Sequence, residues 1–233
     1  MKKITKLASI ALLLTSVTST AFADNWNIGA SASYGNIDGT ASDTQLDNRT
    51  STTVAQTRGA NSGDADFPFA SIFIEYAKTM DKDLDIIIGL DYVPFKAEID
   101  SKSFADTSLE AASTGTGTRQ AKLELENYAT LYLQPTYKIG GGTAVFGKVG
   151  YIHGDVKISG SNTATGSTIN ATDTLNGYVV GLGVQHNINK NVFVRLEGSY
   201  TDHDSVTATD SKGTKFTADS ELIAGKLSIG YSF

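Results

Sequence analysis

The stretch VFVRLEGSY, residues 192–200, alternates between two sets of side chains and therefore predicts a β-strand with two different faces. One face carries Val192, Val194, Leu196, Gly198 and Tyr200, and the other carries Phe193, Arg195, Glu197 and Ser199. A soluble protein would turn the valines and the leucine toward a core, whereas a barrel in a bilayer turns the same residues toward lipid. The remainder of the chain decides between these two orientations.

The first 23 residues have the parts of a secretory signal. Lys2, Lys3 and Lys6 precede an apolar run over about 7–17, and the small residues of the Ala-Phe-Ala segment 21–23 suit cleavage by signal peptidase. This run is too short to span a bilayer. Residues 1–23 are therefore expected to be removed, and the mature chain is expected to be one barrel domain, residues 24–233.

Composition excludes several classes of function. Loss of the three lysines makes the formal net charge of −6 more negative, which argues against nucleic acid as a partner. The chain has no cysteine, so disulfide scaffolds, thiolate catalysis and thiolate metal sites are excluded. No later segment approaches about 18 consecutive apolar residues, so we expect no transmembrane helix. The mean hydropathy of −0.14 does not exclude a membrane barrel, because alternating apolar and polar residues average away.

A period of two runs through almost the whole mature chain and predicts an all-β fold. We expect eight strands, at about 25–35, 67–78, 84–99, 122–138, 144–155, 175–187, 191–202 and 220–233. The connections alternate between three short ones (79–83, 139–143, 187–191) and four long polar ones (36–66, 100–121, 156–174, 203–219). Tight periplasmic turns and longer extracellular loops are typical of an antiparallel up-and-down transmembrane barrel. An even number of strands would leave both termini on the periplasmic side.

The aromatic residues of the lipid-facing parity are expected to form two belts. The upper belt comprises Tyr34, Tyr92, Tyr151, Tyr178 and Tyr200, and the lower belt comprises Trp26, Tyr76, Tyr137, Tyr231 and Phe233. At ~3.3 Å per residue and a tilt near ~40°, Trp26 and Tyr34 differ by roughly 20 Å in height. This approaches the apolar band of about 25 Å that bilayer interfaces flank with aromatic rings. The alternative is that aromatic residues are simply common in strands, but that does not explain which strand ends carry them.

The opposite parity is charged and is expected to face the lumen. Its members are Glu75, Asp85, Asp91, Lys148, Arg195, Glu197 and Lys226. Basic side chains turned toward lipid near the bilayer midplane cost about 2–4 kcal/mol each, which enforces this parity. We therefore expect a charge network inside the barrel.

Three stretches carry a family resemblance: FGKVGY (146–151), VRLEGSY (194–200) and the terminal LSIGYSF (227–233). With them the chain resembles the small outer-membrane β-barrel proteins of Gram-negative bacteria, which include the transmembrane domain of outer membrane protein A and the opacity-type porins. The resemblance implies outer-membrane lipid and lipopolysaccharide as surroundings. It also implies recognition by the barrel assembly machinery through Leu227, Ile229, Tyr231 and Phe233. Because the chain stops at residue 233, we expect no peptidoglycan-binding domain after the barrel.

The resemblance specifies a fold rather than an activity, and three functions stay open. The first is a structural or surface-display protein with a filled lumen, because an eight-stranded barrel is only just wide enough for its interior side chains. Its polar loops would then bind any extracellular ligand, and 36–66 is either a cation or partner site or a solvated surface. The second is a narrow porin-like channel in which Lys148 or Arg195 acts as a gate.

The third function is a lipid-modifying outer-membrane enzyme. His203 precedes Ser205 by two residues and Glu221 follows on the next strand, which is a weak hydrolase pattern. His153 and His186 lie at strand ends, where partly exposed histidines are common. We assign no catalytic residue, cofactor or metal site. A soluble lipocalin-type barrel is the architectural rival, but it needs neither two aromatic belts nor a terminal phenylalanine.

Overall fold

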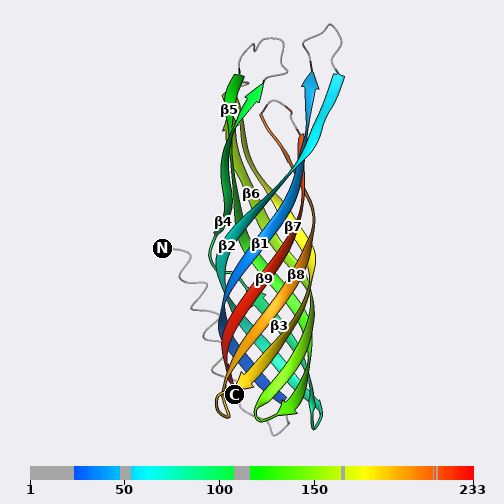
Figure 1. The fold of residues 1–233 in the computed structure, drawn as a ribbon, viewed down its shortest axis with the longest axis vertical. Coiled ribbons are helices and arrows are strands. Elements are labelled where there is room, and N and C mark those ends of the chain that lie inside the picture. Colours follow the sequence, from blue (N-terminus) through cyan, green and yellow to red (C-terminus); the bar gives the residue numbers. More distant parts are fainter. Residues whose placement is uncertain (1–23, 48–53, 108–115, 164–165, 212, 214) are drawn as a thin grey trace.

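The computed structural model describes residues 24–47, 54–107, 116–163, 166–211, 213 and 215–233. These residues form one closed antiparallel β-barrel (Figure 1). Its strands are β1 (Asp24–Asp47), β2 (Val54–Asp81), β3 (Leu84–Tyr92), β4 (Ala97–Thr107), β5 (Thr116–Gly140), β6 (Thr143–Asn162), β7 (Ser167–Asn187), β8 (Val192–Thr209) and β9 (Lys215–Ser232). The described part of the chain contains no helix that is long and apolar enough to cross a membrane. The expected signal peptide lies outside the described residues.

The ring follows the chain order and closes between its first and last members. β1 pairs with both β2 and β9, and β3 pairs with both β2 and β5. β3 and β4 are two parts of the single strand expected at 84–99, interrupted at residues 93–96, so eight positions make up the ring. The prediction of an eight-stranded antiparallel up-and-down barrel is therefore confirmed.

The extent of the four long connections was predicted wrongly. The structure shows strand over most of 36–66, 100–121, 156–174 and 203–219. The pairing of β1 with β2 extends to Asp47 opposite Val54, with one register shift between Ala41 and Asp43. The error has a physical cause. Runs of Ser, Thr, Asn, Asp and Gly were interpreted as turns. The hydrogen bonds between neighbouring strands join backbone groups, however, and need no apolar side chains once the membrane-spanning parts of the strands are paired. The connecting residues 48–53 and 108–115 lie outside the described part of the chain.

The short turns, the start of β1 and the end of β9 lie at one end of the molecule (Figure 1). The start of β1 is joined there to the C-terminal residue, because Trp26 N donates to Phe233 O at 3.1 Å and Phe233 N donates to Trp26 O at 3.0 Å. Gly140, Gly141 and Gly142 have φ values of 95°, 61° and 74°, which only glycine adopts without strain, and they make the β5–β6 turn. The opposite end carries the extended parts of the strands.

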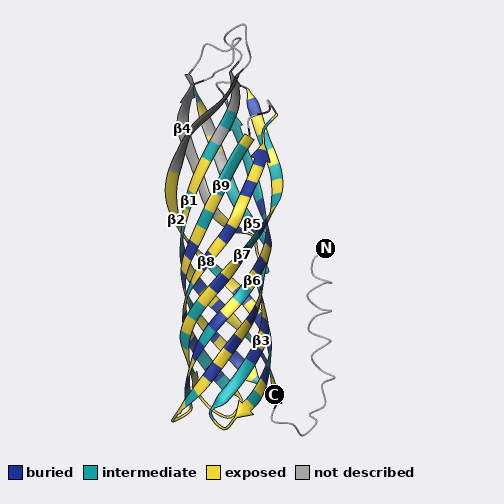
Figure 2. Cartoon of the chain, turned by 90° about the vertical axis from the view of Figure 1, so that its right-hand side faces the viewer, coloured by how far each residue is buried: buried dark blue, intermediate teal, exposed yellow. Residues whose placement is uncertain are grey.

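Buried and exposed residues alternate along the described parts of the strands (Figure 2), so successive side chains point to the lumen and to the outer face in turn. The outer face exposes large apolar residues such as Leu131, Leu182, Leu196 and Leu227. The lumen-facing residues include charged and polar side chains that are buried, Glu75 and Arg195 among them. A soluble protein shows the reverse distribution, so the fold itself indicates a barrel whose outer surface is solvated by lipid.

Candidate functional site

A buried ion pair between β2 and β8 occupies the centre of the lumen. Arg195 donates from Nη1 to Oε1 of Glu75 at 2.6 Å and from Nη2 to Oε2 at 3.2 Å. The Tyr132 hydroxyl donates to Glu75 Oε1 at 2.5 Å, and the Asn27 amide donates to Oε2 at 3.1 Å. Gln185 Oε1 accepts from Nε and Nη2 of Arg195 at 3.2 and 2.8 Å. Glu75 is 0% exposed, so side chains fill the lumen at this height.

Three phenyl rings surround the guanidinium. Its Cζ lies 4.9 Å from the ring centre of Phe193, 5.3 Å from that of Phe146 and 5.7 Å from that of Phe73. Each ring lies over a glycine of a neighbouring strand, where a Cβ would lie within 2.3 Å of a ring atom; the pairs are Phe193 over Gly230, Phe146 over Gly183, and Phe73 over Gly29. The cation–π contacts favour the charged guanidinium, and the glycines make room for the rings.

Two further ion pairs lie in the lumen beside this centre. Lys148 bonds to Glu197 with both side chains buried, and the ammonium lies 4.4 Å from the ring centre of Tyr132. Lys226 Nζ donates to Asp91 Oδ2 at 2.9 Å. Buried pairs of this kind stabilise little on balance, because desolvation offsets the attraction, but removal of one partner leaves an uncompensated charge.

The structure brings six of the seven expected lumen charges together and keeps one apart. Asp85 lies near the lower rim, where it accepts from Lys138 Nζ at 2.8 Å and from Thr79 Oγ1 at 2.8 Å. Alternation places Phe193 on the inward face with Arg195, but sequence reasoning did not single out Tyr132, Phe73 and Phe146 as lumen residues. Alternation could have identified Phe73 and Phe146, which share the inward face of their strands with Glu75 and Lys148, whereas the strand of Tyr132 carries no predicted lumen charge.

An apolar cluster fills the lumen above the charges. It comprises Phe67, Val93, Ala97, Leu125, Tyr128, Ile152, Val156, Leu175, Val179, Val206, Leu222 and Ala224, all buried. The interior of an outer-membrane barrel is ordinarily polar. The lumen therefore has two chemically different halves, and the apolar upper half was not predicted.

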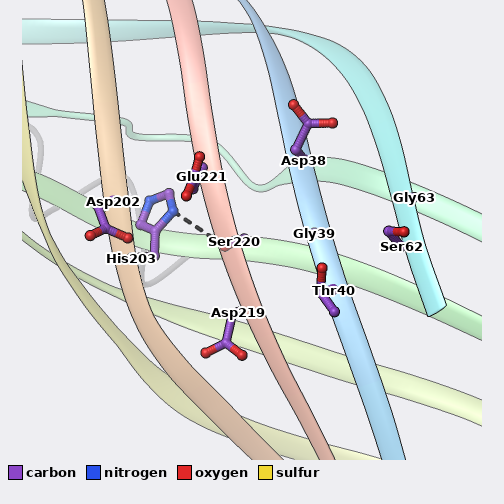
Figure 3. Close-up of a pocket in the computed structure, with 10 residues that line it drawn as sticks. All are labelled: Asp38, Gly39, Thr40, Ser62, Gly63, Asp202, His203, Asp219, Ser220 and Glu221. Carbon is purple, nitrogen blue, oxygen red and sulfur yellow. Dashed lines mark hydrogen bonds between the residues drawn. The ribbon is translucent and has the colours of Figure 1, made fainter. Parts of the chain in front are cut away.

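A row of acids crosses the outside of the upper barrel. Asp64, Asp38, Glu221 and Asp202 lie opposite one another on β2, β1, β9 and β8, and all are exposed. Asp38, Glu221 and Asp202, together with Asp219 and nearby residues, border a shallow depression of about 330 Å³ (Figure 3). Among the described residues no group of three or more acidic or histidine side chains has the arrangement of a metal site. The side chains of 45–61, part of the expected binding loop, lie outside the described residues.

The weak hydrolase pattern is not assembled. His203 is buried and contacts the Tyr128 hydroxyl at 3.2 Å and Ser220 Oγ at 3.3 Å, whereas the exposed Ser205 donates to Asp219. A break in register between His203 and Val206 separates the serine from the histidine face. His153 and His186 are exposed, and their ring nitrogens contact the side chains of Asn176 and Thr143, respectively.

Most of the aromatic residues predicted for the belts are exposed on the outer face. Upper residues Tyr151 and Tyr178 have ring centres 5.5 Å apart, and lower residues Trp26 and Tyr76 have ring centres 5.3 Å apart. Tyr34, Tyr137 and Tyr200 are exposed, whereas Trp26, Tyr76 and Tyr92 are half-buried. The four expected recognition residues, Leu227, Ile229, Tyr231 and Phe233, are all exposed.

Comparison with known proteins agrees with this geometry. A family model described as the outer membrane protein beta-barrel domain matches residues 9–220. The chain belongs to this family. Membership places the protein in the outer membrane of Gram-negative bacteria. It does not assign an activity, because one fold can carry many different functions. No curated protein sequence matches the chain.

Solved structures of outer-membrane β-barrels resemble this family member in fold. The outer membrane protein OprG of Pseudomonas aeruginosa has a TM-score of 0.54 at 16% identity and covers 91% of this chain and 97% of its own. The outer membrane protease OmpT of Escherichia coli has a TM-score of 0.47 at 13% identity, with 94% and 100% covered. Ail, the attachment invasion locus protein of Yersinia pestis, has a TM-score of 0.42 at 15% identity, with 87% and 98% covered.

Proposed function

We propose that this outer-membrane barrel is a non-conducting anchor that displays the extended upper part of its wall at the cell surface. The observation that supports the proposal is the fully buried bidentate pair of Glu75 and Arg195, whose polar atoms are satisfied by Tyr132, Asn27 and Gln185. Such a pair in a narrow barrel leaves little volume for a water path. The apolar cluster above it presents a second barrier to ions.

The alternative is a narrow channel for small solutes in which Arg195 or Lys148 moves aside. Planar-bilayer recording of the purified, refolded protein separates the two functions. The wild type is expected to give no stable conductance steps, whereas E75A is expected to give them more often because it removes the carboxylate that holds Arg195. D85A is the matched control, because Asp85 lies at the rim. Stable steps from the wild type would establish the channel instead.

We also propose that the end carrying the short turns, and with it both termini, lies in the periplasm. The belts would then contact outer-membrane lipid and lipopolysaccharide, and Leu227, Ile229, Tyr231 and Phe233 would be read by the assembly machinery during insertion. Because the chain has no cysteine, a single cysteine reports the side cleanly. S211C, between β8 and β9, should react with an impermeant maleimide in intact cells, and G141C should not. The opposite result would invert the orientation.

We infer that the chain catalyses no reaction and acts through surface binding by its upper strands. Support comes from the separation of His203 from Ser205, since a serine hydrolase needs the imidazole within hydrogen-bond reach of the hydroxyl. The test is a lipid-hydrolysis assay on refolded protein beside S205A. We expect equal background rates. A parent activity that S205A abolishes would contradict the inference.

A further inference from the structure

The barrel wall has an unpaired seam. β2 pairs with β3 only from Asp81 up to Ile72, which lies opposite Tyr92, the last residue of β3. β4 continues the wall on the β5 side from Ala97, but no described residue of β4 pairs with β2. In Figure 1 the upper ends of β1 and β2 lie apart from those of β4 and β5. The seam is therefore bounded by β2 above Ile72 and by the segment from Val93 into β4.

Local sequence keeps the two edges apart. Pro68 lies on the β2 edge and Pro94 lies in the break between β3 and β4; these are two of the chain's three prolines. Proline cannot donate a ladder hydrogen bond, so these positions oppose re-pairing of the edges. On the far side of the break, the β5–β6 register shifts between Glu126 and Ala129, and Asn127 adopts a φ of 53°. Bulges of this kind commonly re-aim side chains beside functional sites.

The seam begins at the height of the upper aromatic belt. Tyr92 ends β3, and Tyr34 lies opposite Pro68 on the paired side of β2. Below this height, unpaired backbone groups in hydrocarbon would cost several kcal/mol each, and there the wall is closed. The seam is thus continuous with the outer face that contacts lipid, at the level where lipid headgroups and water can solvate its edges.

The interior behind the seam is apolar. Phe67 and Val93, one from each edge, belong to the buried cluster that fills the upper lumen, and both are less than 5% exposed. Phe95 lies between Val93 and Ala97, which are 3% and 9% exposed, yet its own side chain is 71% exposed. An aromatic ring therefore projects outward at the seam, and buried apolar side chains lie directly behind it.

We propose that the seam admits an aliphatic acyl chain of a bilayer lipid from the side, and that the apolar cluster binds it. The two cations near the edge whose side chains the structure describes are already paired, Lys96 with Glu126 and Lys122 with both Glu98 and Glu124. The part of the lipid that the site would bind is therefore the acyl chain rather than an anionic headgroup. This binding site goes beyond the display function, because Glu75 and Arg195 close the axial path, whereas at the seam no described residue of β2 pairs with β4.

Tryptophan quenching by acyl-chain bromine tests the proposal. The single native tryptophan, Trp26, is replaced by W26F, and F67W places a reporter in the cluster. F73W is the matched control, because Phe73 lies on the same strand and the same face, below the seam, and is buried to the same extent. In phosphatidylcholine vesicles with brominated chains, F67W is expected to lose roughly half of its emission relative to unbrominated vesicles, and F73W to lose little, because only the upper site encloses the chain.

Closure of the seam provides the second arm. Continuation of the β2–β3 register would set Ala70 opposite Pro94, so A70C and P94C joined by a short bis-maleimide should bridge the edges. Quenching of F67W is expected to fall in the bridged protein and to persist in A70C with the same reagent. Y128W replaces F67W if that variant does not show the faster gel migration of a folded, unboiled barrel. Equal emission of the cluster reporter in both vesicles, or quenching unchanged by the bridge, would overturn the proposal.

Discussion

The lower and upper halves of the barrel differ in the pairing of their strands and in the polarity of their interior. In the lower half every strand is paired on both sides, and the interior is filled by Glu75, Arg195 and their partners. In the upper half no described residue of β2 pairs with β4, and the interior is apolar. The difference follows from the surroundings, because a wall within hydrocarbon must satisfy all its backbone groups internally, whereas a wall at the interface need not. Stability is therefore expected to reside below the seam and adaptability above it.

Removal of one partner of the central ion pair should break the lower half most severely. E75A leaves the Arg195 guanidinium buried without its carboxylate, and we expect a loss of about 3–5 kcal/mol in the free energy of unfolding. D85A should lose no more than about 1 kcal/mol, because Asp85 is at the rim and its partner Lys138 is well exposed. Urea titration of protein folded into vesicles measures both. Similar losses in the free energy of unfolding for the two variants would show that the pair of Glu75 and Arg195 does not have the stabilising role given to it here.

Truncation of matched phenylalanines compares the two halves directly. F73A and F67A delete the same side chain from the same face of β2, one below the seam and one beside it. F73A should cost about 3 kcal/mol or more, because the paired wall around it cannot collapse into the cavity. F67A should cost clearly less, because the free edge of β2 can move inward. The difference between the two unfolding free energies is the measured quantity, and a larger loss for F67A would contradict the comparison.

A methyl group at a lumen glycine should have a smaller effect than either loss. G230A places a Cβ 2.2 Å from the ring of Phe193, so the ring must leave Arg195, at a cost of about 1–3 kcal/mol. G225A, on the same strand, has no atom within 4 Å of the added Cβ and should be nearly neutral. The double variant G230A/F193A should be less destabilised than the sum of its parts. Equal unfolding midpoints for G230A and G225A would refute the proposed packing.

The smallest effect concerns pH and the upper half. His203 lies beyond Tyr200, outside the expected membrane-spanning part, and burial lowers its pKa from the usual 6.5 despite the nearby Asp202 and Asp204 charges. Because the pKa of His203 is lower in the folded protein than in the unfolded chain, the unfolded chain binds a proton more readily. Stability should therefore fall as the pH decreases below about 6.5. H203F should show a weaker decrease between about pH 7 and pH 5 in urea titrations. An unchanged pH slope would exclude this group.

The sequence was sufficient for the fold because its signals are local and repeated. Alternation assigns a face to each residue, so Glu75, Lys148, Arg195 and Glu197 were placed in the lumen from parity alone. Their partners could not be predicted, because Glu75 on β2 meets Arg195 on β8 only after the ring closes, and the stagger of the strands decides which charges share a height. The alternation of side chains identifies which residues face the lumen, whereas the stagger of the strands decides which of these charges form ion pairs.

The seam was also beyond prediction from single strands. Pro94 was included within one strand at 84–99, and Pro68 near the start of another, without recognition that both occupy facing edges. The polar upper strands were assigned to loops for a related reason, since composition reports exposure to water rather than backbone pairing. Both errors concern contacts between distant segments, which no local period encodes.

Residue-resolved amide hydrogen exchange along β2 tests most directly the division of the barrel at Ile72. The account predicts strong protection of the described amides from Ile72 to Thr79, which lie between β1 and β3. Above Ile72, from Asp64 to Ser71, every second amide should exchange rapidly, because it faces the seam while its neighbours bond to β1. Uniform protection through Phe67 would show that β2 and β4 are paired in the protein and would contradict the seam.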